Sequence, residues 1–257
     1  MKKLVLVLGI LMPMTVFADE IPTSGSCAAA GEGNTCLWEY NSDTHTLSIT
    51  GKGKMAEYGF NNSHQTATSP WYAYCDSIQN VIIENGITNI GQAAFYSATK
   101  LETIDIPDSV TSIGVYAFYH TTNLQYVDLP ENLKEIKHAA FYDSGLTNIV
   151  IPESVERIES AAFAIDSLSE ITLSDALKPD ASAFWSGGGS YPHNNLKIYC
   201  KGDVTVCKAN IKKSLARDNH PQVNTLFQIY RNNRRIYTID EANRVAGTKN
   251  RVSIKYR

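Results

Sequence analysis

Residues 101–123 read LETIDIPDSVTSIGVYAFYHTTN, and neighbouring stretches of the chain repeat this pattern. Five copies begin, in order, at Ile78, Leu101, Leu124, Leu146 and Leu168. Each copy contains a phenylalanine, at positions 95, 118, 141, 163 and 184, so the intervals are 23, 23, 22 and 21 residues. A fixed period of this length predicts a solenoid, in which each repeat forms one coil and stacked coils bury a shared core.

Each copy contains the signals for one such coil. Ile104 and Ile106 alternate with polar residues, which is the period of a strand with one buried face. Pro107 cannot donate a ladder hydrogen bond, so the strand is expected to end there. Phe118 then points an aromatic ring inward from a second short segment. Stacking predicts one ladder of leucines and a second ladder of the five phenylalanines.

The composition fits a globular protein with an uneven charge. The chain has 257 residues, 43% of them hydrophobic, and a formal net charge of −3, which excludes disorder and collagen. Residues 1–195 carry 9 Lys/Arg and 22 Asp/Glu, whereas residues 196–257 carry 14 and 4. The main body is therefore acidic and the C-terminal end is basic.

The first 18 residues are predicted to be a signal peptide. Lys2 and Lys3 precede a short apolar run, and Val16-Phe17-Ala18 offers small residues at a cleavage site. The run is too short to span a bilayer, and no later segment approaches the length of a membrane helix. We therefore expect export, to the periplasm, the cell surface or the medium, and no transmembrane segment.

Export favours disulfide formation among the five cysteines, because thiols tend to pair in an oxidising compartment. The simplest pairing joins Cys27 to Cys36 and Cys200 to Cys207, although sequence alone does not fix the connectivity. Cys75 is left over and is either a reactive thiol or a small buried residue. The cysteines and histidines show no metal-ligand spacing, so we expect no metal and no cofactor.

The repeat IPDSVTSIGVYAF resembles the BspA-type leucine-rich repeat of bacterial surface and secreted proteins. The resemblance extends upstream to Leu37-Trp38-Glu39-Tyr40 and to Pro70-Trp71-Tyr72. It implies a β-rich leucine-rich-repeat solenoid wound as a right-handed superhelix, and a binding protein rather than an enzyme. Some relatives are adhesins for host matrix proteins.

The predicted organisation follows from the repeats and the ends that they must cover. Residues 19–77 would form an N-terminal β cap, with Trp38 and Trp71 as packing anchors. The five repeats span residues 78–195. Residues 196–221 would form a strand and an amphipathic helix that close the C-terminal end. Residues 222–257 form a basic segment in which a small β-α-β unit is one interpretation.

Two sets of residues are candidates for ligand binding on the solenoid. One set lies on outward positions of the strands, where Tyr126 belongs to one column and the adjacent Asp105 and Asp128 to the next. The two carboxylates would suit a cation or a basic partner, or they are simply solvated. The other set follows the core phenylalanines and comprises Tyr96, Tyr119, Tyr142 and Trp185. Such aromatics suit protein or surface-glycan ligands, or they pack between coils.

The basic end suits an anionic envelope component. Its candidate residues are Arg231, Arg234, Arg235, Arg251, Lys255 and Arg257. Solvated surface charge is the alternative, and nucleic acid is disfavoured because no recognised binding motif occurs. The chain also has no nucleophile motif or phosphate-binding loop, so we predict no catalytic residues. The predicted function is adhesin-like binding of proteins or cell surfaces, with retention of an envelope-associated structural protein through the basic end as the alternative.

Overall fold

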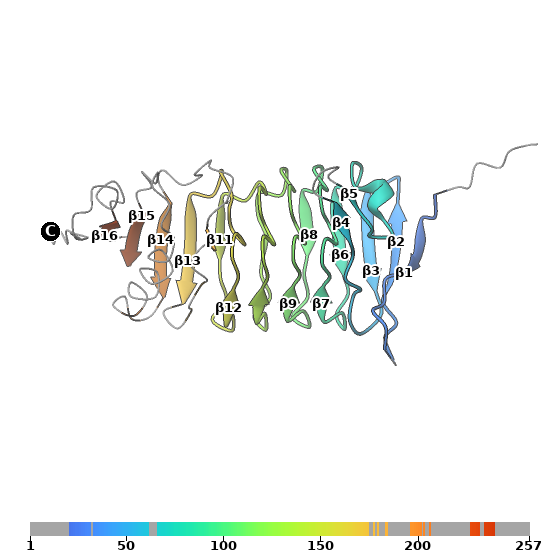
Figure 1. The fold of residues 1–257 in the computed structure, drawn as a ribbon, viewed down its shortest axis with the longest axis horizontal. Coiled ribbons are helices and arrows are strands. Elements are labelled where there is room, and N and C mark those ends of the chain that lie inside the picture. The colour runs from blue at the N-terminus through green and yellow to red at the C-terminus, as the bar shows by residue number, and fades with distance from the viewer. Residues whose placement is uncertain are drawn as a thin grey trace, which may run out of the picture.

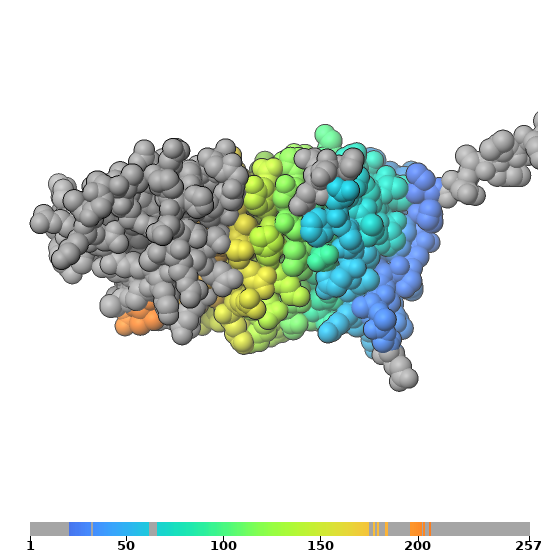
Figure 2. Space-filling model, viewed as in Figure 1, coloured from blue at the N-terminus to red at the C-terminus, as the bar shows by residue number. Residues whose placement is uncertain are grey.

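The computed structural model describes residues 21–31, 33–61, 66–174, 177, 179, 183–184, 196–201, 203 and 206, together with the backbone of residues 227–231 and 234–239. The described chain is a β-solenoid whose strands stack side by side along the long axis, from β1 at one end to β16 at the other (Figure 1). The coils form successive bands on the surface (Figure 2).

The longer strands form two five-stranded sheets on one side of the solenoid. The first sheet has the order β1-β2-β3-β6-β8, and its strands span Ser24–Ser26, Leu37–Asn41, Thr46–Thr50, Asn80–Ile83 and Thr103–Asp105. The second has the order β11-β13-β14-β15-β16, and its strands span Asn148–Val150, Glu170–Ser174, Lys197–Lys201, Phe227–Arg231 and Arg234–Ile239. We call the outward side of this double sheet the strand face.

Shorter strands pair elsewhere along the coils. Four of them form the parallel sheet β12-β10-β9-β7, in which β7 is Asn89–Ile90, β9 Ser112–Ile113, β10 Glu135–Ile136 and β12 Arg157–Ile158. A two-stranded sheet joins β4, Phe60–Asn61, to β5, Thr66–Ala67, and a 3-10 helix spans Tyr72–Tyr74.

The core is a ladder of stacked rings, as the period predicts. Phe95, Phe118, Phe141 and Phe163 are buried, and successive ring centroids lie 5.3, 4.9 and 5.4 Å apart. Phe184 continues the ladder at 6.3 Å. The backbone repeats the contact, because the N–H of Phe118 donates to the carbonyl of Ala140 at 2.7 Å and that of Phe141 to Ala162 at 2.9 Å. Every coil is therefore tied to the next by both a ring and a hydrogen bond.

Trp71 extends this ladder upstream, which sequence reasoning missed. Its indole stacks on Phe95 at 6.0 Å and 26°, and its Nε1 donates to the carbonyl of Ala94 at 2.7 Å. Trp38 packs edge-on against Trp71, so both tryptophans are the buried anchors that the sequence predicts. A coil that contains Trp71 thus precedes the five predicted repeats.

Residues upstream of the repeats are joined to them by strand pairing and by a buried amide. β3 pairs in parallel with β6, while β1 and β2 pair antiparallel to their neighbours. The buried Asn89 accepts a hydrogen bond from the backbone N–H of Met55 at 2.8 Å and donates to its carbonyl at 3.2 Å. The predicted Cys27–Cys36 disulfide is confirmed.

Several predictions fall partly or wholly outside the described residues. Residues 1–18, Cys207 and nearly all of the predicted helix near 204–215 lie there, although Cys200 itself is disulfide-bonded. β14 coincides with the predicted final strand, and β16 lies in the basic segment for which a β-α-β unit is one interpretation. β15 was not predicted, and it pairs antiparallel with β16 while extending the sheet from β14. Within the basic segment, β15 and β16 therefore form an antiparallel pair that continues the solenoid sheet.

Candidate functional site

The strand face presents two outward rows of side chains, in the columns that the sequence predicts. Strand pairing aligns Asn80 with Thr103 and Ile82 with Asp105. It also aligns Asn148 with Glu170 and Val150 with Thr172. Tyr126 and Asp128 occupy the equivalent places in the third copy, and so each row runs across successive coils.

Three large apolar side chains on these rows are exposed. The exposed fractions are 47% for Ile82, 56% for Tyr126 and 52% for Val150. The inward residues of the same segments, Val81 and Val127, are buried. Because the core does not use these exposed side chains, they are available for contact with another molecule.

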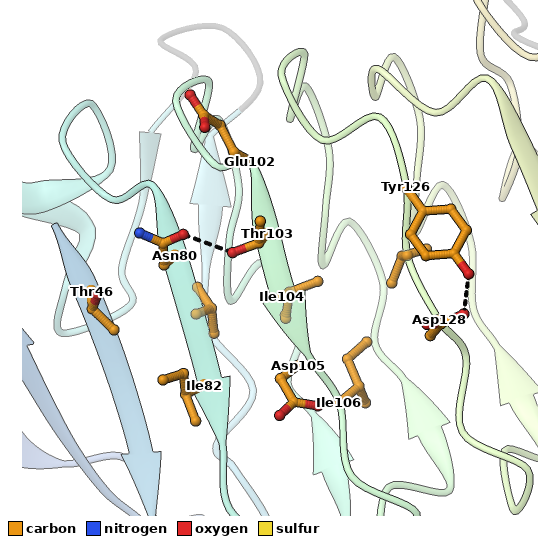
Figure 3. Close-up of a pocket in the computed structure, with 12 residues that line it drawn as sticks. Thr46, Asn80, Ile82, Glu102, Thr103, Ile104, Asp105, Ile106, Tyr126 and Asp128 are labelled. Atoms are coloured by element: carbon orange, nitrogen blue, oxygen red, sulfur yellow. Dashed lines mark hydrogen bonds between the residues drawn. The ribbon is translucent and has the colours of Figure 1, made fainter. Parts of the chain in front are cut away.

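Tyr126 and Asp128 form a polar unit beside Asp105. The Tyr126 hydroxyl donates to Oδ1 of Asp128, and this hydrogen bond raises the pKa of the tyrosine. Both residues line a groove with Asp105, Thr103 and Ile104 (Figure 3). The structure therefore brings together the three strand-face residues predicted as a candidate site.

The predicted tyrosine stripe is a stack that runs beside the ring ladder. Tyr96, Tyr119 and Tyr142 stack with centroids 4.8 and 5.0 Å apart. Tyr96 is only 1% exposed, and Phe60 packs over it at 6.2 Å. Burial raises the pKa of Tyr119 to about 12. Tyr119 and Tyr142 keep part of their surface exposed, whereas Tyr96 offers little area to a ligand.

The remaining candidate residues are of two kinds. Some lie outside the described residues, and three are described by their backbone alone. Trp185, Arg251, Lys255 and Arg257 lie outside the described residues. Arg231 and Arg234 are register partners across the β15–β16 hairpin, and Arg235 is the partner of Tyr230. The hairpin thus gathers three of the predicted basic residues at one turn.

The two histidines of the repeats have partners that the sequence pattern did not reveal. Nδ1 of His120 lies 2.6 Å from Oδ2 of Asp143 in the next coil. Nδ1 of His138 lies 2.8 Å from the Ser160 hydroxyl, and its Nε2 lies 3.3 Å from the Tyr116 hydroxyl. Both histidines therefore connect consecutive coils. The available signal for these contacts was the repeat period, because each histidine and its partner are separated by 22 or 23 residues in the sequence.

Cys75 is half-buried and carries a free thiol. Burial, with a further contribution from Asp76, raises the pKa of this thiol, which disfavours the reactive thiolate. Within the described ranges no group of three or more His, Cys, Asp or Glu is placed to hold a metal ion. Nor does any helix among the described residues have the length and apolarity needed to cross a membrane.

Comparison with known families identifies the repeat. Residues 65–186 match the model of the BspA type leucine rich repeat region in six copies. Residues 65–186 form a BspA-type leucine-rich-repeat region. The match starts upstream of the five copies predicted from Ile78, in agreement with the additional coil that contains Trp71.

Two solved structures of bacterial proteins are similar to this chain, and the first is a leucine-rich repeat protein. One from Eubacterium ventriosum is 24% identical with a TM-score of 0.53, and the match covers 70% of this chain and 45% of that one. The pneumococcal vaccine antigen PcpA is 20% identical with a TM-score of 0.49, covering 73% of this chain and 45% of that one. The chain spans less than half the length of either protein. A search of the curated proteins found no match.

Proposed function

We propose that this chain is an exported, adhesin-like protein that binds a protein partner through its strand face. The single observation that carries the proposal is the group of exposed apolar side chains on the strand face, Ile82, Tyr126 and Val150, which lie in or beside one groove. Exposed apolar area on a regular scaffold favours recognition, because the fold gains nothing from it. The BspA-type repeat region, which is typical of bacterial surface and secreted proteins, supports the same function.

Display of the protein outside the cell forms part of this proposal. The predicted signal peptide at residues 1–18 supports export, and the Cys27–Cys36 disulfide is typical of an oxidising compartment. A leucine-rich-repeat solenoid acts here as a scaffold for binding rather than for catalysis. A surface glycan is the alternative ligand for the same face.

The test compares strand-face variants of the full chain in binding to intact epithelial cells and to a panel of immobilised extracellular-matrix proteins. The double change Ile82→Ser with Val150→Ser removes apolar contact and leaves every charge in place. Each lost side-chain contact is worth about 1 kcal/mol, so we expect at least a tenfold loss of bound protein. Ile21→Ser is the matched control, since Ile21 is similarly exposed but lies outside both sheets of the strand face.

Equal thermal unfolding of the variants and the wild type would show that the fold is intact. Binding that survives the double change, or a wild type that binds none of these surfaces, would overturn the proposal. Retained binding to a glycan array alone would assign the face to a sugar ligand and would also overturn it.

We infer a second candidate function, retention on an anionic envelope surface, from the β15–β16 hairpin. The register brings Arg231, Arg234 and Arg235 to one turn of this hairpin, within a segment whose charge is opposite to that of the solenoid. Changing all three arginines to glutamine should release the protein from cells into the medium. High salt should release the wild type in the same way, and salt-insensitive attachment would contradict this candidate.

A further inference from the structure

The strand face is interrupted at one place, between β8 and the third repeat. The first five-stranded sheet ends at β8 and the second begins at β11. Residues 126–128 lie between these strands, and among the described residues no backbone hydrogen bond joins them to β8. Ile104 of β8 is consequently only partly covered, whereas Val81 and Ile149, the inward residues at the same repeat position, are 1% and 2% exposed.

A groove of about 510 Å³ lies over this interruption. On its β8 side the Thr103 hydroxyl donates to the Asn80 side chain at 2.7 Å, and on the other side the Tyr126 hydroxyl donates to Asp128 (Figure 3). Ile104 contributes apolar surface between these two hydrogen-bonded pairs. The groove therefore combines an aliphatic surface, an aromatic ring and fixed polar walls.

All the charged side chains that line the groove are acidic, namely Glu102, Asp105 and Asp128. The ion pairs found in the described part of the chain involve other residues, so none of these carboxylates has a cationic partner there. Among the described residues, Asp128 accepts a hydrogen bond only from the neutral hydroxyl of Tyr126. The groove thus offers uncompensated negative charge beside apolar surface.

We propose that the groove is a subsite for an arginine or lysine side chain in an extended segment of a partner protein. The proposal rests on the proposed function and names the chemistry of its partner. The aliphatic stem of the cationic side chain packs on Ile104 and on the Tyr126 ring, and its charged head lies between Asp105 and Asp128. Arginine fits best, because its planar guanidinium both stacks on an aromatic ring and pairs with carboxylates. A bare metal ion would gain nothing from the apolar surface.

The row that contains Asp105 and Asp128 also presents apolar side chains on both sides of the groove, and their spacing suits an extended peptide. Ile82, Asp105, Asp128 and Val150 come from four successive coils, whose core phenylalanine rings are stacked 5.3, 4.9 and 5.4 Å apart even where the sheet is interrupted. At this coil spacing, the midpoint between the coils of the two aspartates is roughly 8 Å from the coils of Ile82 and of Val150. Alternate residues of an extended peptide are separated by a comparable distance, about 6.8 Å. The face fits a segment with a central Arg or Lys and an apolar residue two positions to each side.

The experiment measures peptide binding to the full chain by surface plasmon resonance. One immobilised peptide has arginine at its centre, valine two residues to each side and a threonine background. A second replaces the arginine with citrulline, which has nearly the same shape without the charge. We expect the arginine peptide to bind at least tenfold more tightly, and salt to reduce this difference.

The variant Asp105→Asn with Asp128→Asn keeps the side-chain shapes and removes the charge. It should bind the arginine peptide as weakly as the wild type binds the citrulline peptide. The matched control, Glu131→Gln with Glu153→Gln, changes two exposed carboxylates outside the groove and should bind like the wild type. Equal binding of the two peptides, or full binding by the double asparagine variant, would overturn the proposal.

The outcomes separate this inference from the function on which it rests. The Ile82 and Val150 changes could abolish cell binding while the two peptides bind equally. That result would keep the strand face as the binding surface and would rule out a subsite for a cationic side chain. Charge-dependent peptide binding with unchanged cell binding would support the subsite and contradict the proposed function. A dimer of the chain that the arginine peptide dissociates would assign the groove to a second copy and would also overturn the partner proposed here.

Discussion

The ring ladder and the strand face are built by the same repeat, yet only the ladder is regular. Phe95, Phe118, Phe141 and Phe163 recur in every coil with nearly constant spacing. On the strand face the outward residues change type from coil to coil, and the sheet itself is interrupted at residues 126–128. Inward positions must match the rings above and below, whereas outward positions are free to differ. The difference indicates that stability resides in the ladder and recognition on the strand face.

The largest loss of stability is expected when a ring of the phenylalanine ladder is removed. Phe118→Ala removes a fully buried ring that contacts both neighbouring phenylalanines. The cavity should lower the free energy of unfolding by about 3–5 kcal/mol, as measured by urea denaturation. Tyr126→Ala, at an exposed position of the strand face, should change it by less than about 0.5 kcal/mol. Similar losses in both variants would remove the distinction between the two regions.

A smaller loss of unfolding free energy is expected for a substitution at Gly114, where two coils approach closely. A Cβ on Gly114 would lie 2.6 Å from both the backbone N of Gln92 and the carbonyl C of Gly91. Since backbone cannot give way like a flexible side chain, Gly114→Ala should cost about 1–3 kcal/mol of unfolding free energy. Lys137→Ala is the matched control, because Lys137 occupies the same repeat position one coil later. A neutral Gly114→Ala would show that the coils are spaced more loosely than the structure indicates.

The tyrosine stack should make the free energy of unfolding depend modestly on pH. Burial raises the pKa of Tyr119 from 10.0 to about 12, so the folded state holds this proton more tightly than the unfolded state. The resulting stabilisation is complete below pH 10 and is lost as the pH rises towards 12. Relative to the wild type, Tyr119→Phe should therefore lose less stability across this interval, measured by chemical denaturation at each pH. Identical pH slopes would mean that Tyr119 is exposed to solvent.

Much of this molecule could be predicted from its sequence, because the repeat encodes it locally. The alternation around Ile104, the stop at Pro107 and the periodic phenylalanines predict the strands, their ends and the ladder. The outward columns follow from the same alternation. The close spacing of Cys27 and Cys36 made their pairing the simplest one, and the structure has this disulfide.

Features that depend on contacts between distant or unlike segments could not be predicted in this way. Trp71 continues the ladder from an additional coil in which a tryptophan takes the place of the phenylalanine of the five copies, and Phe60 covers Tyr96 from a hairpin between coils. Nothing in the third repeat distinguishes Tyr126-Val127-Asp128 from a paired strand, since its apolar and polar residues alternate as in the other copies. The groove therefore became visible only with the backbone pairing.

Hydrogen–deuterium exchange of the backbone amides tests the central claim most directly, namely that the strand face is open at residues 126–128. Amides without a ladder partner exchange by local fluctuations, whereas paired strands must first open. We predict that the amides of 126–128 exchange about 100-fold or more faster than those of β6 and β13. Equal protection along all the coils would mean that the sheet is continuous, and it would contradict the groove and the recognition site built on it.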